Sequence, residues 1–304
     1  MDNPSHPQPI TERVNENTRN LDRMTALEIV TVMNQEDHLV PAAIQPVLPA
    51  VARTVDHMVD TLKQGGRIFY IGAGTSGRLG VLDASECPPT FSTDPEWVQG
   101  IIAGGDWALR HAVEGAEDSP EQGARDLMAR DFCSRDLCIG LAASGRTPYV
   151  QGAISHAKKI GALTAVITCN PGSPLGRLAD IPIEVNVGPE VLVGSTRLKA
   201  GTAQKLILNM LSTAAMVRMG KVYENLMVDL HPSNQKLKQR ARRIVQSVTG
   251  ACKDEVEQAL IKCGGETKTA ILMLMAGLDP EEARYRLNEA DGMIQKALEN
   301  VLNK

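Results

Sequence analysis

The chain lacks the sequence features of membrane-spanning, secreted and nucleic-acid-binding proteins. No apolar run reaches the roughly 18–20 residues that cross a bilayer. The first residues have neither the basic start nor the apolar stretch of a secretory signal. The formal net charge is −4, and no block of lysine and arginine is present. We therefore expect a cytoplasmic protein that acts on a small molecule, with neither nucleic acid nor membrane as a partner.

The six cysteines include no C-x-x-C pair, which argues against a zinc site and a disulfide framework. We expect reduced thiols that mostly fill the core. They are Cys87, Cys133, Cys138, Cys169, Cys252 and Cys263.

The length of 304 residues, 43% of them hydrophobic, fits one large domain or two smaller ones. Five apolar runs alternate with helical patterns, and this alternation predicts an α/β fold with a doubly wound parallel sheet and helices on both faces. The runs cover residues 67–71, 98–103, 137–141, 163–168 and 181–187.

Several helix ends are also marked. Thr25 stands three residues before Glu28, which is the spacing of a capping box, and Ser119 and Thr147 each precede a proline at a helix start. A helix over about 47–63 is expected to end at glycines, and a long helix is expected over about 199–219.

The domain organisation follows from shifts in composition. The polar, proline-rich residues 1–20 predict a flexible arm, and residues 21–230 predict the sheet-containing catalytic domain. Beyond about residue 230 the strand patterns stop and only short helical patterns remain, so residues 231–304 predict a small all-helical unit.

Two segments rich in glycine and hydroxyl groups carry most of the functional information. Gly72-Ala-Gly-Thr-Ser-Gly77 and Ala142-Ala-Ser-Gly-Arg-Thr147 each follow an apolar run and precede a helix start. Glycines let backbone N–H groups crowd around an anion, and a helix N-terminus adds partial positive charge. The pair of loops therefore predicts a site that holds one phosphate from two sides.

Three other interpretations of the first loop agree less well with its residues. Its G-x-G-x-x-G spacing is that of a dinucleotide site, but the acidic residue expected at the end of the second strand is missing, because that strand ends in Ile102-Ala-Gly-Gly105. No Gly-Lys-Ser/Thr follows, which excludes a P-loop. Simple tight turns would explain the glycines but not the clustered Thr75, Ser76, Ser144 and Thr147.

Both loops resemble the phosphate-binding loops of the sugar-isomerase (SIS) domain, and longer motifs resemble the N-acetylmuramic acid 6-phosphate etherase family. One departure from the wider SIS pattern is Ala142, where many members have serine. The motifs of the etherase family cover residues 72–80, 82–90, 111–118, 194–205 and 225–229, and the resemblance extends over nearly the whole chain from about Asn20.

The resemblance implies a carbon–oxygen lyase of amino-sugar catabolism and cell-wall sugar recycling, with a sugar phosphate as substrate and a homodimer as its assembly. The reaction it implies is removal of the C2 proton, departure of lactate from C3 and addition of water. This elimination and hydration needs no metal or other cofactor.

The resemblance also implies two catalytic carboxylates. Glu86 is expected to protonate the departing lactate and then to activate water, and Glu117 is expected to remove the C2 proton. We expect Glu86 on a constrained turn, because Pro88 and Pro89 follow it. Glu114 is the main alternative to Glu117, and His111 is more typical of a structural residue.

The remaining candidates bind the substrate. The loop residues expected to hold the phosphate are Gly74, Thr75, Ser76, Ser144, Gly145, Arg146 and Thr147. Ser195, Arg197 and Lys199 lie near the start of the long helix, where side chains and backbone amides are expected to meet the phosphate or the lactyl carboxylate. A non-catalytic sugar-phosphate sensor and an aldose–ketose isomerase remain alternatives.

Overall fold

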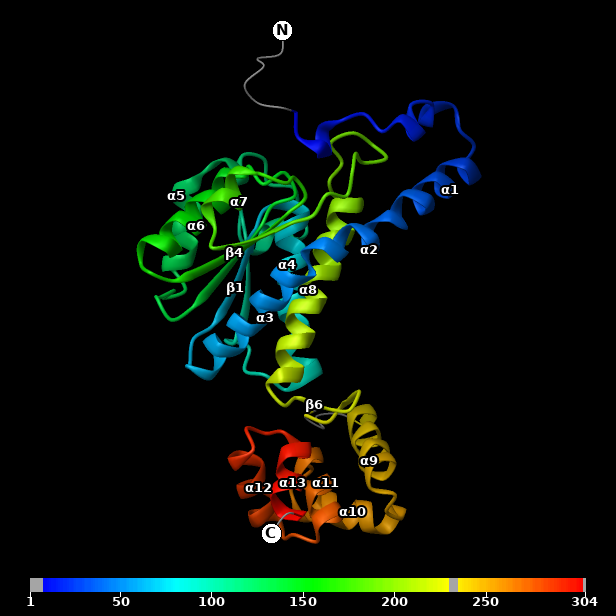
Figure 1. Ribbon diagram of the computed structural model, residues 1–304, viewed down its shortest axis with the longest axis vertical. Coiled ribbons are helices and arrows are strands. Elements are labelled where there is room, and N and C mark those ends of the chain that lie inside the picture. The colour runs from blue at the N-terminus through cyan, green and yellow to red at the C-terminus, as the bar shows by residue number, and fades with distance from the viewer. Residues whose placement is uncertain (1–7, 230–234, 303–304) are drawn as a thin grey trace. The chain divides into compact units, whose positions relative to one another are not determined.

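The computed structural model describes residues 8–229 and 235–302, and it divides into two compact units (Figure 1). The first unit comprises residues 1–85 and 96–212, and the second comprises residues 86–95 and 213–304. In the described part of the chain, no helix is both long and apolar enough to cross a bilayer.

The first unit is built on a five-stranded parallel sheet with the order β2-β1-β3-β4-β5. The predicted α/β fold is therefore confirmed. The strands are β1 (Ile68–Gly72), β2 (Val98–Ile102), β3 (Leu137–Leu141), β4 (Leu163–Thr168) and β5 (Ile181–Glu184).

Helices cover both faces of the sheet, as Figure 1 shows. α3 (Leu48–Lys63) contacts β1, β3 and β5, and α6 (Pro148–Lys159) contacts β1, β3 and β4. α6 packs on a core that includes Phe69 and Ile71. The other helices that lie wholly in this unit are α1 (Ala26–Asp37), α2 (Leu39–Ile44), α5 (Pro120–Met128) and α7 (Pro174–Leu178).

Two of the three predicted helix caps form as expected. Thr25 and Glu28 make a capping box at the start of α1, and the Ser119 hydroxyl accepts a hydrogen bond from the Gln122 backbone at the start of α5. Thr147 occupies the cap position of α6, but its side chain makes no cap hydrogen bond. The Thr147 hydroxyl is therefore not used to close the helix.

Residues 8–20 differ from the flexible arm that their composition predicts. They form two short 3-10 turns, at Ile10–Glu12 and Glu16–Thr18, and a third turn at Leu21–Arg23 follows them. Thr11 is fully buried, and the Asn170 side chain donates to its hydroxyl and accepts from the Ile10 backbone. The expectation was wrong here because these polar residues satisfy backbone and side-chain groups of distant loops.

Two long helices, α4 (Gly74–Phe91) and α8 (Lys199–Arg218), each contribute residues to both units. α4 continues through Pro88 and Pro89, so the predicted turn at Glu86 is wrong. The φ of proline is compatible with a helix. Proline disturbs a helix because it has no backbone N–H and because its ring crowds the carbonyl of the preceding turn. The helix here loses two backbone hydrogen bonds without ending.

The second unit contains a short hairpin and five helices among its described residues. The hairpin pairs β6 (Val222–Tyr223) with β7 (Leu226–Met227), and the sequence analysis missed it. The helices are α9 (Gln235–Thr249), α10 (Lys253–Lys262), α11 (Thr267–Ala276), α12 (Pro280–Glu289) and α13 (Ile294–Leu302). The predicted boundary between residues 230 and 231 lies outside the described residues.

Candidate active site

The two predicted phosphate loops follow neighbouring strands. Gly72, the last residue of β1, is in register with Leu141, the last residue of β3. In the strand order β2-β1-β3-β4-β5, the connections leave β1 and β3 in opposite directions, and ligands of open α/β sheets bind at such a point beyond the carboxyl ends of the strands. The topology therefore places both loops side by side at the carboxyl end of the sheet.

The first loop, residues 72–77, passes directly into α4. A side chain on Gly72 or Gly77 would lie within 2.8 Å of backbone or side-chain atoms, so both positions require glycine. Gly74 has a φ of 52°, in the left-handed region. Thr75 is half-buried, whereas Ser76 is buried and its hydroxyl donates to Gln204 over 2.8 Å.

The second loop, residues 142–147, is more open. Ser144 is half-buried, and its Oγ accepts a hydrogen bond of 3.2 Å from the Arg146 backbone. Gly145 has a φ of 67°, and a Cβ there would lie 2.3 Å from the Cβ of Ser173. Arg146 is exposed. Among the described residues, the Ser144 and Thr147 hydroxyls thus have no buried partner of the kind that holds Ser76.

A cavity of about 200 Å³ joins the first loop to the segment that carries Glu117. Its lining includes Gly74, His111, Glu114 and Glu117. Arg78 donates to the Leu109 and His111 backbone carbonyls, over 3.0 and 3.1 Å, and so fixes the start of this segment to α4. The structure therefore places Glu117 beside the predicted phosphate loop, and it places Glu114 there as well.

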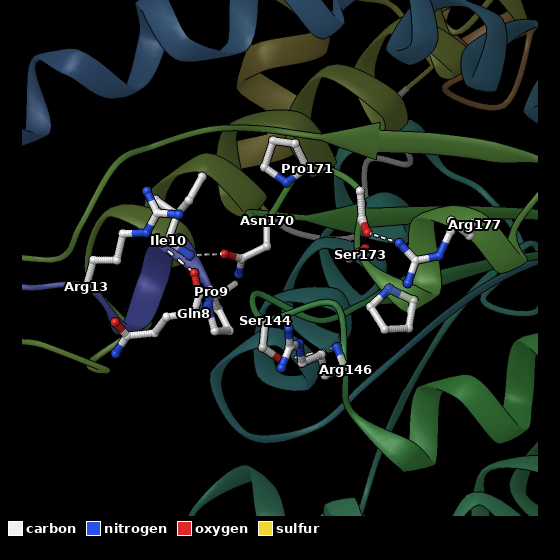
Figure 2. Close-up of a pocket in the computed structure, with 12 residues that line it drawn as sticks. Gln8, Pro9, Ile10, Arg13, Ser144, Arg146, Asn170, Pro171, Ser173 and Arg177 are labelled. Atoms are coloured by element: carbon white, nitrogen blue, oxygen red, sulfur yellow. Dashed lines mark hydrogen bonds between the residues drawn. The ribbon is translucent and has the colours of Figure 1, made fainter. Parts of the chain in front are cut away.

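A second cavity, of about 460 Å³, lies at the second loop (Figure 2). Ser144 and Arg146 line it together with Asn170 and residues of the amino-terminal segment. Its lining includes three arginines, Arg13, Arg146 and Arg177, and among the residues that the structure describes it includes no aspartate or glutamate. The charge of this cavity favours an anionic ligand.

Comparisons with known proteins agree with this architecture. The amino-terminal SIS domain of glucokinase regulatory protein matches residues 50–158, the SIS domain matches residues 116–214, and the carboxy-terminal lid domain of glucokinase regulatory protein matches residues 224–268. A Bacteroides fragilis chain described as a phosphosugar isomerase superposes with a TM-score of 0.51 at 19% identity, over 68% of this chain and 98% of that one. At this identity the likeness shows the fold alone.

Sequence relatives are much closer. The N-acetylmuramic acid 6-phosphate etherase of Serratia proteamaculans is 56% identical over 289 residues, which cover 95% of this chain and 97% of the relative. N-acetylmuramic acid 6-phosphate etherase 1 of Bacillus licheniformis is 56% identical over 288 residues, which cover 95% of each chain. This chain belongs to the N-acetylmuramic acid 6-phosphate etherase family. The resemblance drawn from its motifs is confirmed.

The two carboxylates expected in an etherase lie in different units. Glu117 belongs to the first unit, in the short 3-10 turn Ala116–Asp118, and Glu86 belongs to the second unit, in α4. Both side chains are exposed. Their catalytic roles in this etherase remain predictions.

The start of α8 differs from the predicted anion site. Glu190 is fully buried and accepts hydrogen bonds of 2.9 Å from the Lys199 and Ala200 backbone amides. Burial raises the pKa of Glu190 against the effect of these donors. Because a carboxylate of the protein already occupies these amides, they are not open to a substrate anion.

The Lys199 side chain also has an internal partner. It is 1% exposed, and its ammonium lies 2.6 Å from a carboxylate oxygen of Glu36 on α1. Ser195 is half-buried and Arg197 is exposed, in the loop that precedes α8. Of the three predicted residues in this region, only these two present side chains that a ligand could reach.

Sequence reasoning missed two polar residues of the loop region. Asn170 follows β4 and donates to the Ala143 carbonyl over 3.1 Å, which ties the second loop to the amino-terminal segment. Gln204 lies on α8 and holds Ser76 of the first loop. The signal for Gln204 was present, since it interrupts the apolar stripe of a long helix that includes Ala203 and Ile207.

Proposed function

We propose that this chain cleaves the lactyl ether of N-acetylmuramic acid 6-phosphate with water, releasing N-acetylglucosamine 6-phosphate and D-lactate. It is a carbon–oxygen lyase. The observation that carries this conclusion is the identity of more than 50% along nearly the full length of relatives named for this activity. The two hydroxyl-rich loops at the sheet edge supply the phosphate-binding part of such a site.

The chemistry defines what the residues have to do. An unactivated ether is a poor leaving group, but opening of the pyranose to its aldehyde makes the C2 proton acidic. A base removes this proton, the C3–O bond breaks as an acid protonates lactate, and water adds at C3 of the unsaturated aldehyde. We assign Glu117 as the base, because it lines the cavity at the first loop.

Glu86 is our candidate for the acid that protonates lactate and then activates water. Its side chain is exposed on α4, where a substrate could reach it, and a carboxylic acid can donate the proton that a departing lactate needs.

The phosphate at C6 is assigned to the two loops. Residues 74–76 and 144–147 supply backbone N–H groups and hydroxyls, and Arg146 adds a positive charge beside Ser144. Ser195 and Arg197 are assigned to the lactyl carboxylate. We do not extend this assignment to Lys199, because Glu36 binds its ammonium.

Assembly and location belong to the same proposal. Leu27 and Val30 on α1 are 74% and 57% exposed, and Figure 1 shows α1 projecting from the rest of the first unit. A second copy of the chain would cover such side chains, which supports a homodimer. The free cysteines support the cytoplasm as its location.

An assay of D-lactate formation by the purified protein tests the function. We expect release from N-acetylmuramic acid 6-phosphate, and far slower release from the unphosphorylated sugar. In water labelled with heavy oxygen, the label is expected at C3 of the product. An aldose–ketose isomerase would release no lactate, and a sensor would bind the phosphosugar without turnover; either result would refute the proposal.

A further inference from the structure

Gln204 contacts the first loop, and although it lies in the motif at residues 194–205, no role has been assigned to it. The residue is fully buried on α8, and Ser76, its partner, is 8% exposed at the start of α4. The Ser76 hydroxyl donates to Gln204 Oε1 over 2.8 Å. A Cβ on Gly201, one turn earlier on α8, would lie 3.6 Å from Thr75 Cγ2, so this face of α8 packs directly against the loop.

The placement of the amide has a consequence for phosphate binding. A hydroxyl carries one proton, and Ser76 commits that proton to Gln204. An ionised phosphate only accepts hydrogen bonds, so in this orientation the Ser76 side chain has nothing to donate to it. The Gln204 Nε2 group, meanwhile, is buried and has no hydrogen-bond partner among the described residues.

A rotation of the amide by 180° resolves both problems. The two ends of a glutamine amide have nearly the same shape, so the rotation changes the hydrogen bonds and leaves the packing intact. Nε2 then donates to Ser76 Oγ, which gives the buried N–H group a partner. The Ser76 proton is released and can point out of the loop toward an anion.

We propose that Gln204 is a positioning residue for the phosphate of the substrate: by donating through Nε2 to Ser76, it directs the Ser76 hydroxyl proton to a phosphate oxygen. The proposal rests on the phosphosugar function assigned above. Gln204 itself touches neither the phosphate nor the reacting carbons, and it acts only through Ser76.

The same two helices offer a matched control. One to two turns further along, Asp83 on α4 accepts hydrogen bonds from Asn209 and Ser212 on α8, over 3.0 and 3.1 Å. Asn209→Leu removes a hydrogen bond between α4 and α8 but leaves the loop untouched. It reports what a loss of helix contact alone does to catalysis.

The test compares Gln204→Met, Gln204→Glu and Asn209→Leu in the D-lactate assay. Methionine removes the donor at similar volume, and a carboxylate holds the Ser76 proton while adding negative charge behind the loop. We expect KM to rise about tenfold for Gln204→Met and further for Gln204→Glu, as for a hydrogen bond to a charged group, with kcat changed less than about threefold. Asn209→Leu is expected to keep both constants near the wild type. If Gln204→Met does not fold, the KM of Gln204→Glu is used to test the proposal.

A double variant shows whether Gln204 acts through Ser76. In a Ser76→Ala background, Gln204→Met is expected to cause no further rise in KM. Effects that multiply, a KM unchanged in Gln204→Met, or an equal rise in Asn209→Leu would each overturn the proposal. The affinity of each variant for N-acetylglucosamine 6-phosphate, measured by titration calorimetry without turnover, keeps this result separate from a failure of the etherase activity itself.

Discussion

The first and second phosphate loops look alike in the sequence and differ in how the fold holds them. In residues 72–77 the serine hydroxyl is buried and bonded to a distant helix, through Ser76 and Gln204. In residues 142–147, Ser144 accepts a local backbone hydrogen bond and no other within the described part of the chain, and the Thr147 side chain makes no cap hydrogen bond. The comparison teaches that one loop is fixed by the scaffold in advance, whereas the other has hydroxyls left for the ligand.

The cavities at the two loops differ in the same sense. The cavity at the first loop contains the candidate base Glu117 together with Glu114, and the cavity at the second loop contains three arginines and no acidic side chain. In the proposed mechanism, the base lies on the side that the scaffold fixes, and the three arginines that favour an anion lie on the more open side. Precise placement matters more for a base than for a charge that binds an anion.

The largest effect is expected at the first loop. Glu117→Gln removes the base without changing its size, so kcat for D-lactate release is expected to fall about 10²- to 10⁴-fold. Glu114→Gln is the matched control in the same cavity, and its kcat is expected to stay within about threefold of the wild type. A larger loss in Glu114→Gln than in Glu117→Gln would transfer the role of base to Glu114.

Substitution of one glycine in each loop separates two causes of destabilisation, which are the left-handed backbone conformation and the lack of space for a side chain. Gly145→Ala places a Cβ 2.3 Å from Ser173 and forces alanine to a φ of 67°. Gly74→Ala has a φ of 52° but meets no atom within 4 Å. We expect a loss of about 1–2 kcal/mol in unfolding free energy for Gly74→Ala, from the left-handed conformation alone. For Gly145→Ala we expect about 1–3 kcal/mol more, from overpacking. Urea unfolding measures both, and equal losses would contradict the difference in packing.

The serines of the two loops test the comparison most directly. Ser144→Ala is expected to raise KM about tenfold with little change in melting temperature, because its hydroxyl serves the ligand. Ser76→Ala is expected to raise KM and also to lower stability by about 1–3 kcal/mol, since it leaves the buried Gln204 amide without a partner. A Ser144→Ala variant that melts as early as Ser76→Ala would show that both loops are held alike.

The smallest effect is expected away from both loops, at Glu36. Burial raises the pKa of this carboxyl, but hydrogen bonds from Lys199, Asn17 and Asn15 outweigh burial and hold the pKa below its ordinary value of 4.5. An acid whose pKa is lowered by folding stabilises the folded state above its unfolded pKa, and this stability is lost as the pH falls through the folded pKa. Wild-type stability is therefore expected to decline below about pH 4.5.

The variant Glu36→Gln lacks this titration. Its unfolding free energy is expected to be lower at neutral pH, because the Lys199 charge stays buried without its partner, and to fall less steeply in acid. Chemical denaturation at several pH values between neutral and acid measures how the unfolding free energy of the wild type and of Glu36→Gln depends on pH. Identical slopes in the two proteins would show that Glu36 does not contribute.

The sequence predicted the parts of the fold that depend on neighbouring residues. The five strands agree with the apolar runs to within a few residues, and the Thr25–Glu28 capping box forms as its spacing indicates. Both signals are local, because burial of a strand and closure of a helix end depend on residues close in the chain. The two loops were located for the same reason, and their role in phosphate binding stays a prediction.

The errors have a common cause, which is that distant contacts decide the outcome. A pair of prolines was taken to end α4, but a helix that is already packed tolerates the lost hydrogen bonds. Lys199 was assigned to a ligand because nothing local shows Glu36, which is 163 residues away in the chain. Gln204 is 128 residues from Ser76, so the sequence could mark it as an unusual polar residue but could not identify its partner.

The way Asn170 holds the amino-terminal segment bears on how the protein can be handled. The Asn170 amide forms hydrogen bonds with Ile10, Thr11 and the Ala143 carbonyl at the same time. It therefore links the segment around Thr11 to the second loop. A truncation past Thr11 removes the amino-terminal partners of this buried amide and leaves it only the Ala143 carbonyl among the contacts described above. An enzyme shortened in that way would report on damaged loop geometry rather than on the native catalyst.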